Sequence, residues 1–310
     1  MKKVVVLLIV LILVFSLVGC YSFTSDKLPS DISSNVEKAA ETENQEEIKT
    51  NDNVTADNND AGNKNANITE TVIYDANDIV VTAKSISYDE WMGPELSVLI
   101  ENNSSQNITV QTRNTSINGL MVDPFFSADV ASGKKANEAI TFMSSELELA
   151  GITAIQTIET QLHIFNTDSW DDVHNSDVIV ITTDITEYSQ KFDDAGIVAY
   201  DEGGIKIVAK KLNSSDSFWG ADLYLYIENN SDANVTIQVR DCSIDGFMVD
   251  PIFSNEIVQG KKAFDSITFM ESDLTDNEIT DITSIELSFH LFDTDSWDTI
   301  KDTDPITITF

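Results

Sequence analysis

Apolar and polar residues alternate along much of the chain after residue 72, which predicts half-buried β-strands. Leu96, Val98 and Ile100 alternate with Ser97, Leu99 and Glu101, the turn residues Asn102–Ser104 follow, and a second alternating stretch runs over Ile108–Arg113. Further strands are expected at 79–85, 140–142, 155–165 and 178–183. A short helix is expected after Ser145, where Ser-Glu-Leu-Glu resembles a capping box.

This pattern occurs twice in the chain. The sequence Ile-Glu-Asn-Asn-Ser at 100–104 returns at 227–231, an offset of 127 residues, and Thr-Asp-Ser-Trp-Asp at 167–171 returns at 294–298 with the same offset. A long period without a register slip indicates one domain built twice. Several short strands and one small helix in each copy predict an all-β chain with two tandem Ig-like β-sandwich domains, at 72–187 and 197–310. The polar stretch Asp184–Gly196 is the expected linker.

The first twenty residues have the pattern of a sorting signal. Met1-Lys2-Lys3 is basic, Val4–Val18 is apolar but short for a membrane-spanning helix, and Leu-Val-Gly-Cys follows at 17–20. This ending resembles the lipobox of bacterial lipoproteins, which implies a signal peptide at 1–19, cleavage before Cys20 and acylation of Cys20. The alternative is an uncleaved membrane anchor, and either one leaves the rest of the chain outside the cytoplasmic membrane. The aromatic-poor, acidic stretch at 20–71 predicts a disordered tether.

The chain is strongly acidic, with 53 Asp and Glu against 18 Lys and Arg and a net charge of −35. Nucleic-acid binding needs a basic surface, so this class of function is excluded. Docking on anionic lipid is disfavoured for the same reason. The charge favours solubility, cation accumulation or a basic partner.

Tandem all-β domains behind a lipobox and a polar tether resemble the Ig-like surface lipoproteins of unknown function found in clostridia and related bacteria. The strand–turn element Ile-Glu-Asn-Asn-Ser carries most of that resemblance. It implies a non-catalytic binding or spacer module, lipid-anchored on the extracytoplasmic face of the cell membrane. The expected partner is an unknown surface protein or a cell-wall ligand. The alternatives are a sensory or accessory subunit of a membrane complex and, third, a surface hydrolase.

The chain carries no familiar catalytic motif. Gly-x-Ser-x-Gly, His-Glu-x-x-His and Walker-type loops do not occur in the sequence, so we expect no enzyme activity and no cofactor. If Cys20 carries lipid, Cys242 has no partner for a disulfide. Its counterpart in the first copy is Thr115, so Cys242 is expected to be a small, partly buried residue and not a nucleophile.

The two arginines of the chain, Arg113 and Arg240, occupy equivalent positions in the two copies. The planar guanidinium group favours bidentate contact with a carboxylate. We therefore expect a structural ion pair in each copy, with Asp123 and Asp250, or Glu101 and Glu228, as the partners. The alternative is that the arginines bind an anionic ligand group.

Asp293, Asp295 and Asp298 are spaced like the start of a calcium-binding loop, although the central Gly and the distal Glu of an EF-hand are missing. We expect a turn in which Trp297 closes the end of the sandwich, with calcium binding as the alternative. His163 and His290 are expected to point outward as solvated or cross-strand residues, because their apolar neighbours in the strand take the inward face. One His in each copy is too few for a zinc site. The short Gly-Lys-Lys sequences at 133–135 and 260–262 are expected to be turns or guards of a strand edge.

Overall fold

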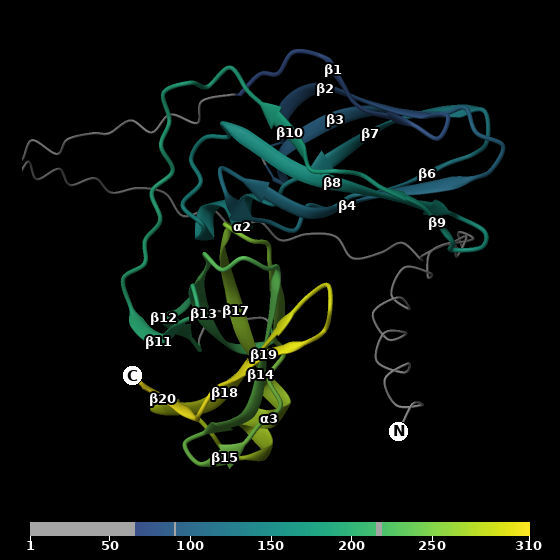
Figure 1. The fold of residues 1–310 in the computed structure, drawn as a ribbon. Coiled ribbons are helices and arrows are strands. Elements are labelled where there is room, and N and C mark those ends of the chain that lie inside the picture. Colours follow the sequence, from purple (N-terminus) through teal and green to yellow (C-terminus); the bar gives the residue numbers. More distant parts are fainter. Residues whose placement is uncertain (1–65, 90, 215–218) are drawn as a thin grey trace, which may run out of the picture. The chain divides into compact units, whose positions relative to one another are not determined.

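The computed structural model describes residues 66–89, 91–214 and 219–310 (Figure 1). These residues form β-strands and two short helices, α2 (Ser144–Leu149) and α3 (Glu271–Asp276). The predicted all-β class is therefore confirmed. The predicted signal peptide, Cys20 and the tether up to residue 65 lie outside the described residues. Within the described ranges, no helix has the length and apolar character needed to cross a lipid bilayer.

The first copy consists of two antiparallel sheets. Its strands are β1 (Thr71–Ala76), β2 (Ile79–Asp89), β3 (Gly93–Asn102), β4 (Ile108–Ile117), β5 (Leu120–Met121), β6 (Ser127–Val130), β7 (Lys134–Thr141), β8 (Thr157–Asn166), β9 (Asp172–Asn175) and β10 (Ile179–Thr182). One sheet has the order β1-β2-β3-β7. In the other, β4 pairs with β5, β6 and β8, and β8 also pairs with β9 and β10.

The second copy repeats this topology strand by strand. Its strands are β11 (Ile197–Glu202), β12 (Ile205–Asn213), β13 (Gly220–Asn229), β14 (Val235–Ile244), β15 (Phe247–Met248), β16 (Ser254–Ile257), β17 (Lys262–Met270), β18 (Ser284–Asp293), β19 (Thr299–Asp302) and β20 (Ile306–Thr309). The strands β17, β13, β12 and β11 follow one another in one sheet, and a parallel bridge between β17 and β5 joins them to the second sheet of the first copy. The other sheet contains β14 and β18, with β15, β16, β19 and β20. Two sheets in each copy give the predicted tandem Ig-like sandwich.

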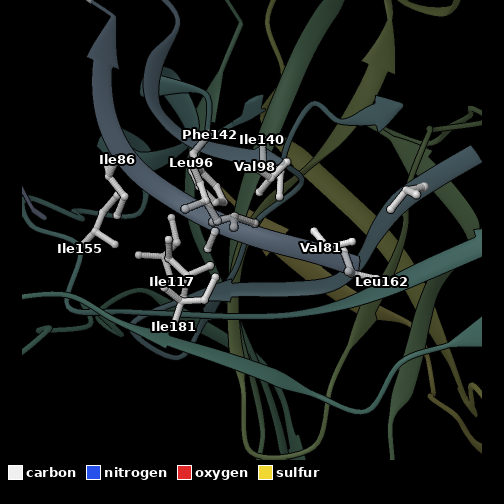
Figure 2. Packing of buried hydrophobic residues seen from close by; sticks show 14 of the residues in the cluster. Val81, Ile86, Leu96, Val98, Ile117, Ile140, Phe142, Ile155, Leu162 and Ile181 are labelled. Carbon is white, nitrogen blue, oxygen red and sulfur yellow. The ribbon is translucent and has the colours of Figure 1, made fainter. Parts of the chain in front are cut away.

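Alternation along the strands produces the core of each copy, because successive side chains of a strand point to opposite faces. In β3, Leu96, Val98 and Ile100 are fully buried, as predicted. Figure 2 shows Leu96 and Val98 in the first core, with Leu162 and Ile181 of the opposite sheet in the same cluster. A separate cluster, which contains Leu223, Leu225 and Ile227, forms the core of the second copy.

Apolar residues on both sides of the predicted first domain also pack against its core. Ala66 and Ile68 belong to the predicted tether, yet Ala66 is buried and Ile68 packs against the first core. On the linker side, Ile185 is buried in the same core, and Tyr188 and Phe192 pack against it. The interpretation of 184–196 as a polar linker missed these three apolar side chains, which attach the segment to the first copy.

The expected capping box at the short helix is wrong. The residue before α2 is Met143, in extended conformation, and its side chain caps no backbone group. Glu146 Oε1 instead accepts a hydrogen bond from the backbone N–H of Asp123, at 2.8 Å. The acidic side chain is therefore used across the fold and not at the start of its own helix.

A buried asparagine explains the repeated Ile-Glu-Asn-Asn-Ser element. Asn229 is fully buried at the end of β13, and its Nδ2 donates to the carbonyl oxygens of Ala233 and Ile257, both at 2.8 Å. Its Oδ1 accepts from the N–H of Ser231 at 3.0 Å and from the hydroxyl of Ser231 at 2.6 Å. Asn102 makes the matching four bonds in the first copy. One amide side chain thus joins a strand end, its turn and β6 or β16.

We expect Asn229→Ala to lower the free energy of unfolding by at least about 2 kcal/mol, since each buried polar group left without a partner costs about 1–3 kcal/mol. Chemical denaturation of the full chain measures this. Asn230→Ala is the matched control, because Asn230 is exposed. Its Nδ2 donates one exposed hydrogen bond to Glu228 Oε2, at 3.1 Å. Equal losses in the two variants would contradict the role assigned to Asn229.

Candidate functional site

The loops that follow β8 and β18 each display a tryptophan on the surface. Trp170 is 65% exposed and Trp297 is 76% exposed, so the expectation that Trp297 closes the end of the sandwich is wrong. Both residues have left-handed backbone conformations, with φ values of 65° and 64°. Such a conformation in a bulky residue costs on the order of 1–3 kcal/mol and is concentrated at functional sites. Both copies carry this strain at the same position.

Hydrogen bonds within the loop hold the tryptophan in place. Asp293 Oδ1 accepts from the backbone N–H groups of Asp295 at 3.0 Å and Ser296 at 2.8 Å, and Asp293 O accepts from the N–H of Trp297 at 2.8 Å. In the first copy the Oδ1 of Asn166 accepts from the equivalent two N–H groups, both at 2.9 Å. The loop therefore needs a side-chain oxygen at this position and no charge.

The structure does not bring Asp293, Asp295 and Asp298 together as a calcium site. The bond from the backbone N–H of Ser296 is the main reason that the pKa of Asp293 lies below its ordinary value, and this carboxylate is engaged with the loop backbone. Asp295 Oδ2 accepts from Asn234 Nδ2 at 3.5 Å. Across the described residues, no group of three or more His, Cys, Asp or Glu side chains is placed to hold a metal ion.

An aromatic stack supports each tryptophan from the sheet side. The ring of Trp297 stacks on Phe292 at a centroid distance of 5.5 Å and an interplanar angle of 18°, and Phe292 lies 5.3 Å from the ring of His290. His290 and Phe292 are two residues apart on β18, so they share a face, and the loop turns Trp297 back over it. The first copy repeats the stack with Trp170, Phe165 and His163 at 5.4 and 5.2 Å.

The two histidines are buried, so the expectation of solvated imidazoles is wrong. The expectation of a cross-strand contact is confirmed: His290 Nδ1 lies 2.6 Å from Asp302 Oδ1 on β19, and His163 Nδ1 lies 2.6 Å from Asn175 Oδ1 on β9. The aromatic stack covers one side of each imidazole ring. Alternation of residues along a single strand does not reveal this cover, so the burial could not be predicted from it.

The arginines lie on the same outer face. The register pairs Thr236, Gln238 and Arg240 of β14 with Phe292, His290 and Ser288 of β18. We name this surface the Trp–Arg face. In the first copy it comprises Thr109, Gln111, Arg113, Gln161, His163, Phe165 and Trp170, and in the second Thr236, Gln238, Arg240, Ser288, His290, Phe292 and Trp297.

The expected bidentate ion pairs of the arginines are not formed. Arg240 makes one contact, from a guanidinium nitrogen to Asp302 Oδ1 at 3.8 Å, and both side chains are about half exposed or more. Arg113 is exposed and has no ion pair among the described residues. The predicted partner carboxylates Glu101 and Glu228 pair with Lys135 and Lys262. A shift in strand register follows each arginine. β-Bulges, which cause such shifts, often occur next to functional sites.

The buried thiol offers no nucleophile. Cys242 is buried, and this burial raises its pKa to about 12, so the thiol stays protonated at neutral pH. Thiolates, not thiols, are the reactive form of cysteine. Cys242 therefore contributes to packing, in the second core cluster.

A cleft of about 610 Å³ is lined by several carboxyl groups, among them those of Asp123, Glu146, Glu256 and Asp265. Burial raises the pKa of Glu146 to about 7, although its hydrogen bond from the Asp123 N–H acts in the opposite direction. Burial also raises the pKa of Asp265 and of Glu256. Ionisation of these carboxyl groups therefore lowers the stability of the folded state.

Comparison with known proteins assigns no family to the chain. No protein-family model matches it, and no curated protein matches it. Among solved structures it is similar to the YadV chaperone, with 10% identity, a TM-score of 0.23, and coverage of 75% of this chain and all of the other. It is also similar to the Salmonella enterica SafB chaperone complex with SafA pilin, with 8% identity, a TM-score of 0.19, and coverage of 70% and 89%. Similarities of this size assign no activity.

The protein is therefore described by its own fold and candidate site. It is an all-β protein of two Ig-like copies, each with a displayed tryptophan on the outer face of one sheet. The structure brings His, Phe, Trp and Arg together on that face, whereas the sequence pattern suggested separate roles for them. The signal that could have revealed the face is the identical spacing of His, Phe and Trp in both copies, at 163–170 and 290–297.

We expect Glu146→Gln to stabilise the fold at pH 8. The pKa of Glu146 is raised in the folded state, so its ionisation destabilises the fold as the pH rises from about 4.5 through 7. Gln keeps an oxygen for the Asp123 N–H but carries no charge. Relative to the parent chain, the variant should gain about 1–3 kcal/mol between pH 4.5 and pH 8. Denaturation at both pH values tests this, with the exposed neighbour Glu148→Gln as the control. An equal difference at the two pH values would contradict it.

Proposed function

We propose that this chain is a lipid-anchored, extracytoplasmic and non-catalytic binding module that uses the Trp–Arg face of each copy to bind a neutral polysaccharide of the cell wall. The observation that carries the proposal is the tryptophan, exposed and held in a strained backbone conformation on a phenylalanine in both copies. One face of each indole packs on the phenylalanine, and most of the side chain remains accessible to a ligand.

The chemistry of the face fits a sugar ring. A pyranose has one face of C–H groups, which stacks on an indole, and an edge of hydroxyl groups, which needs hydrogen-bonding partners. Trp297 supplies a flat apolar surface with low conformational freedom, and the side chains of Gln238 and Arg240 lie farther along the same face. The net charge of −35 repels anionic polymers, which favours a neutral saccharide.

Duplication strengthens the case for a repetitive ligand. Each copy presents the same tryptophan on the same stack, so a polymer with repeated units offers a partner to both faces. The second binding event is then intramolecular and raises the overall affinity without any new contact. A pure spacer would have no use for two such surfaces.

The described residues also support a role without catalysis. His163 and His290 are buried with Nδ1 within hydrogen-bonding distance of Asn175 and Asp302, and Cys242 is a buried thiol with a raised pKa. A general base must reach the proton that it removes, and an active cysteine must be a thiolate that substrate can approach. Anchoring and location rest on the lipobox at 17–20.

We expect the full chain to sediment with insoluble bacterial cell walls stripped of anionic polymers, and we expect Trp170→Ala and Trp297→Ala each to weaken this binding. Loss of one stacking surface costs about 1–3 kcal/mol, so each variant should bind roughly tenfold more weakly. The double variant should bind roughly a hundredfold more weakly, because both faces act on one polymer and their two free-energy losses add. Depletion of the protein from the supernatant measures the affinity.

The matched control for this experiment is Trp91→Ala. Trp91 is 87% exposed, but no aromatic stack supports it among the described residues. The Trp91→Ala variant should bind cell walls as the parent chain does. Binding that persists in the double variant, or equal losses for all three tryptophans, would remove the Trp–Arg face from the proposed function.

Anchoring is tested separately at Cys20. The lipobox implies that the thiol of Cys20 carries the lipid, so Cys20→Ala should abolish labelling by a radioactive fatty acid and leave the precursor uncleaved. Cys242→Ala is the control, and it should be labelled like the parent. Continued labelling of Cys20→Ala chains would overturn the lipoprotein assignment without affecting the binding face.

A further inference from the structure

We propose that molecules of this chain associate head to tail, through a contact between molecules that repeats the contact between the two copies within the chain. The second copy of one molecule would use its β15 edge to dock on the β7 edge of the first copy of the next. The occupant of each surface is thus a second copy of this chain.

The contact between the copies combines a strand bridge, an ion pair and apolar packing. Lys262 N–H at the start of β17 donates to Gly119 O beside β5, at 3.1 Å, and Lys262 is the register partner of Leu120. Lys261 Nζ lies 2.5 Å from Glu159 Oε1. Met121 also packs against the second core cluster.

Both sides of this contact occur a second time in the sequence. The side donated by the first copy is Gly119, Leu120, Met121 and Glu159, and its equivalents in the second copy are Gly246, Phe247, Met248 and Glu286. The side donated by the second copy is Lys261 and Lys262, and its equivalents in the first copy are Lys134 and Lys135. Each equivalent keeps the glycine, the apolar character or the charge that the contact uses.

The second set of residues is uncovered. Leu120 is 1% exposed where the copies meet, whereas Phe247 is 48% exposed and Met248 is 67% exposed. Lys261 and Glu159 are partly buried, whereas Lys134 and Glu286 are exposed. The contact between the copies buries this apolar surface in the first copy, whereas the second copy leaves the equivalent apolar surface open. A pair of adjacent exposed apolar side chains otherwise costs solubility.

The strand order shows the same open positions. β5 lies between β4 and β17, so a strand borders it on both sides. In the described part of the chain, β15 pairs only with β14, and β7 ends the sheet β1-β2-β3-β7 with Lys134 and Lys135 exposed at its start. Open strand edges are templates for pairing with another chain.

The contact is heterologous, because it joins two different surfaces. A heterologous contact leaves one unused copy of each surface in every complex, so it adds molecules in a row instead of closing a pair. It should be weaker between molecules than within one. The linker residue Phe192, whose ring lies 5.2 Å from Lys262 Nζ, comes with the covalent connection, and the position of Phe264 is Asn137 in the first copy. Reversible, concentration-dependent association follows.

Charge reversal at the equivalent ion pair tests the proposal with the full chain. Glu286→Lys places two lysines opposite each other between molecules, and Lys134→Glu places two glutamates there. Each variant alone should associate at least roughly tenfold more weakly than the parent chain in a concentration series followed by sedimentation velocity. A mixture of the two variants should regain parental association, because the lysine introduced in one molecule would then face the glutamate introduced in the next.

The apolar part of the contact has its own test. Met248→Asp should weaken association by a similar factor, while Ile252→Asp should leave it unchanged, because Ile252 is similarly exposed but lies outside the proposed contact. Unfolding curves should show that all four variants are folded, since every substituted side chain is exposed. Absence of association in the parent chain, association that ignores the variants, or failure of the mixture to regain it would each overturn the proposal.

Discussion

The two-sheet core of each copy is the constraint on which the other features of this protein depend. A strand can bury only every second side chain, so one face of each sheet enters the core and the other remains outside. Ile237 and Leu291 take the inner positions, which leaves Gln238 and His290 on the outer face. The aromatic stack, the arginine and the loop tryptophan all lie on that outer face, which needs no further packing to keep the sandwich folded. Residues on the outer face can therefore differ without a change in the core residues that hold the two sheets together.

The long strands could be predicted from the sequence, whereas the candidate site could not be predicted as a unit. Alternation at Leu96, Val98 and Ile100 identifies β3, but the two-residue strands β5 and β15 are too short to carry a period. The exposure of Trp297 depends on a left-handed backbone and on loop hydrogen bonds, neither of which appears in a hydrophobic pattern. The burial of His290 depends on a loop that turns back across its own strand. The expected arginine ion pairs depended on distances between strands, which spacing along the chain does not contain.

Comparison of the two copies is informative because their local sequences are so similar. Where Leu120 is covered and Phe247 is exposed, the difference reflects the neighbours of each copy and not its own fold. Where Asn102 and Asn229 make the same four hydrogen bonds, the agreement shows a requirement of the fold. The same comparison identifies the loop tryptophan as a feature that both copies maintain despite its cost in backbone strain.

The attachment of the segment after β10 to the first copy has a consequence for synthesis. Strand β4 pairs with β8 in the same register as β14 pairs with β18, so a nascent chain has wrong strand partners of almost equal quality within its own length. Such exchange between similar neighbours is a common misfolding route of tandem repeats. Ile185, Tyr188 and Phe192 pack on the first core, so the first copy can finish its own core before β14 and β18 are made. The order of translation then sorts the strands, and the connecting segment acts as a stop that separates one folding event from the next.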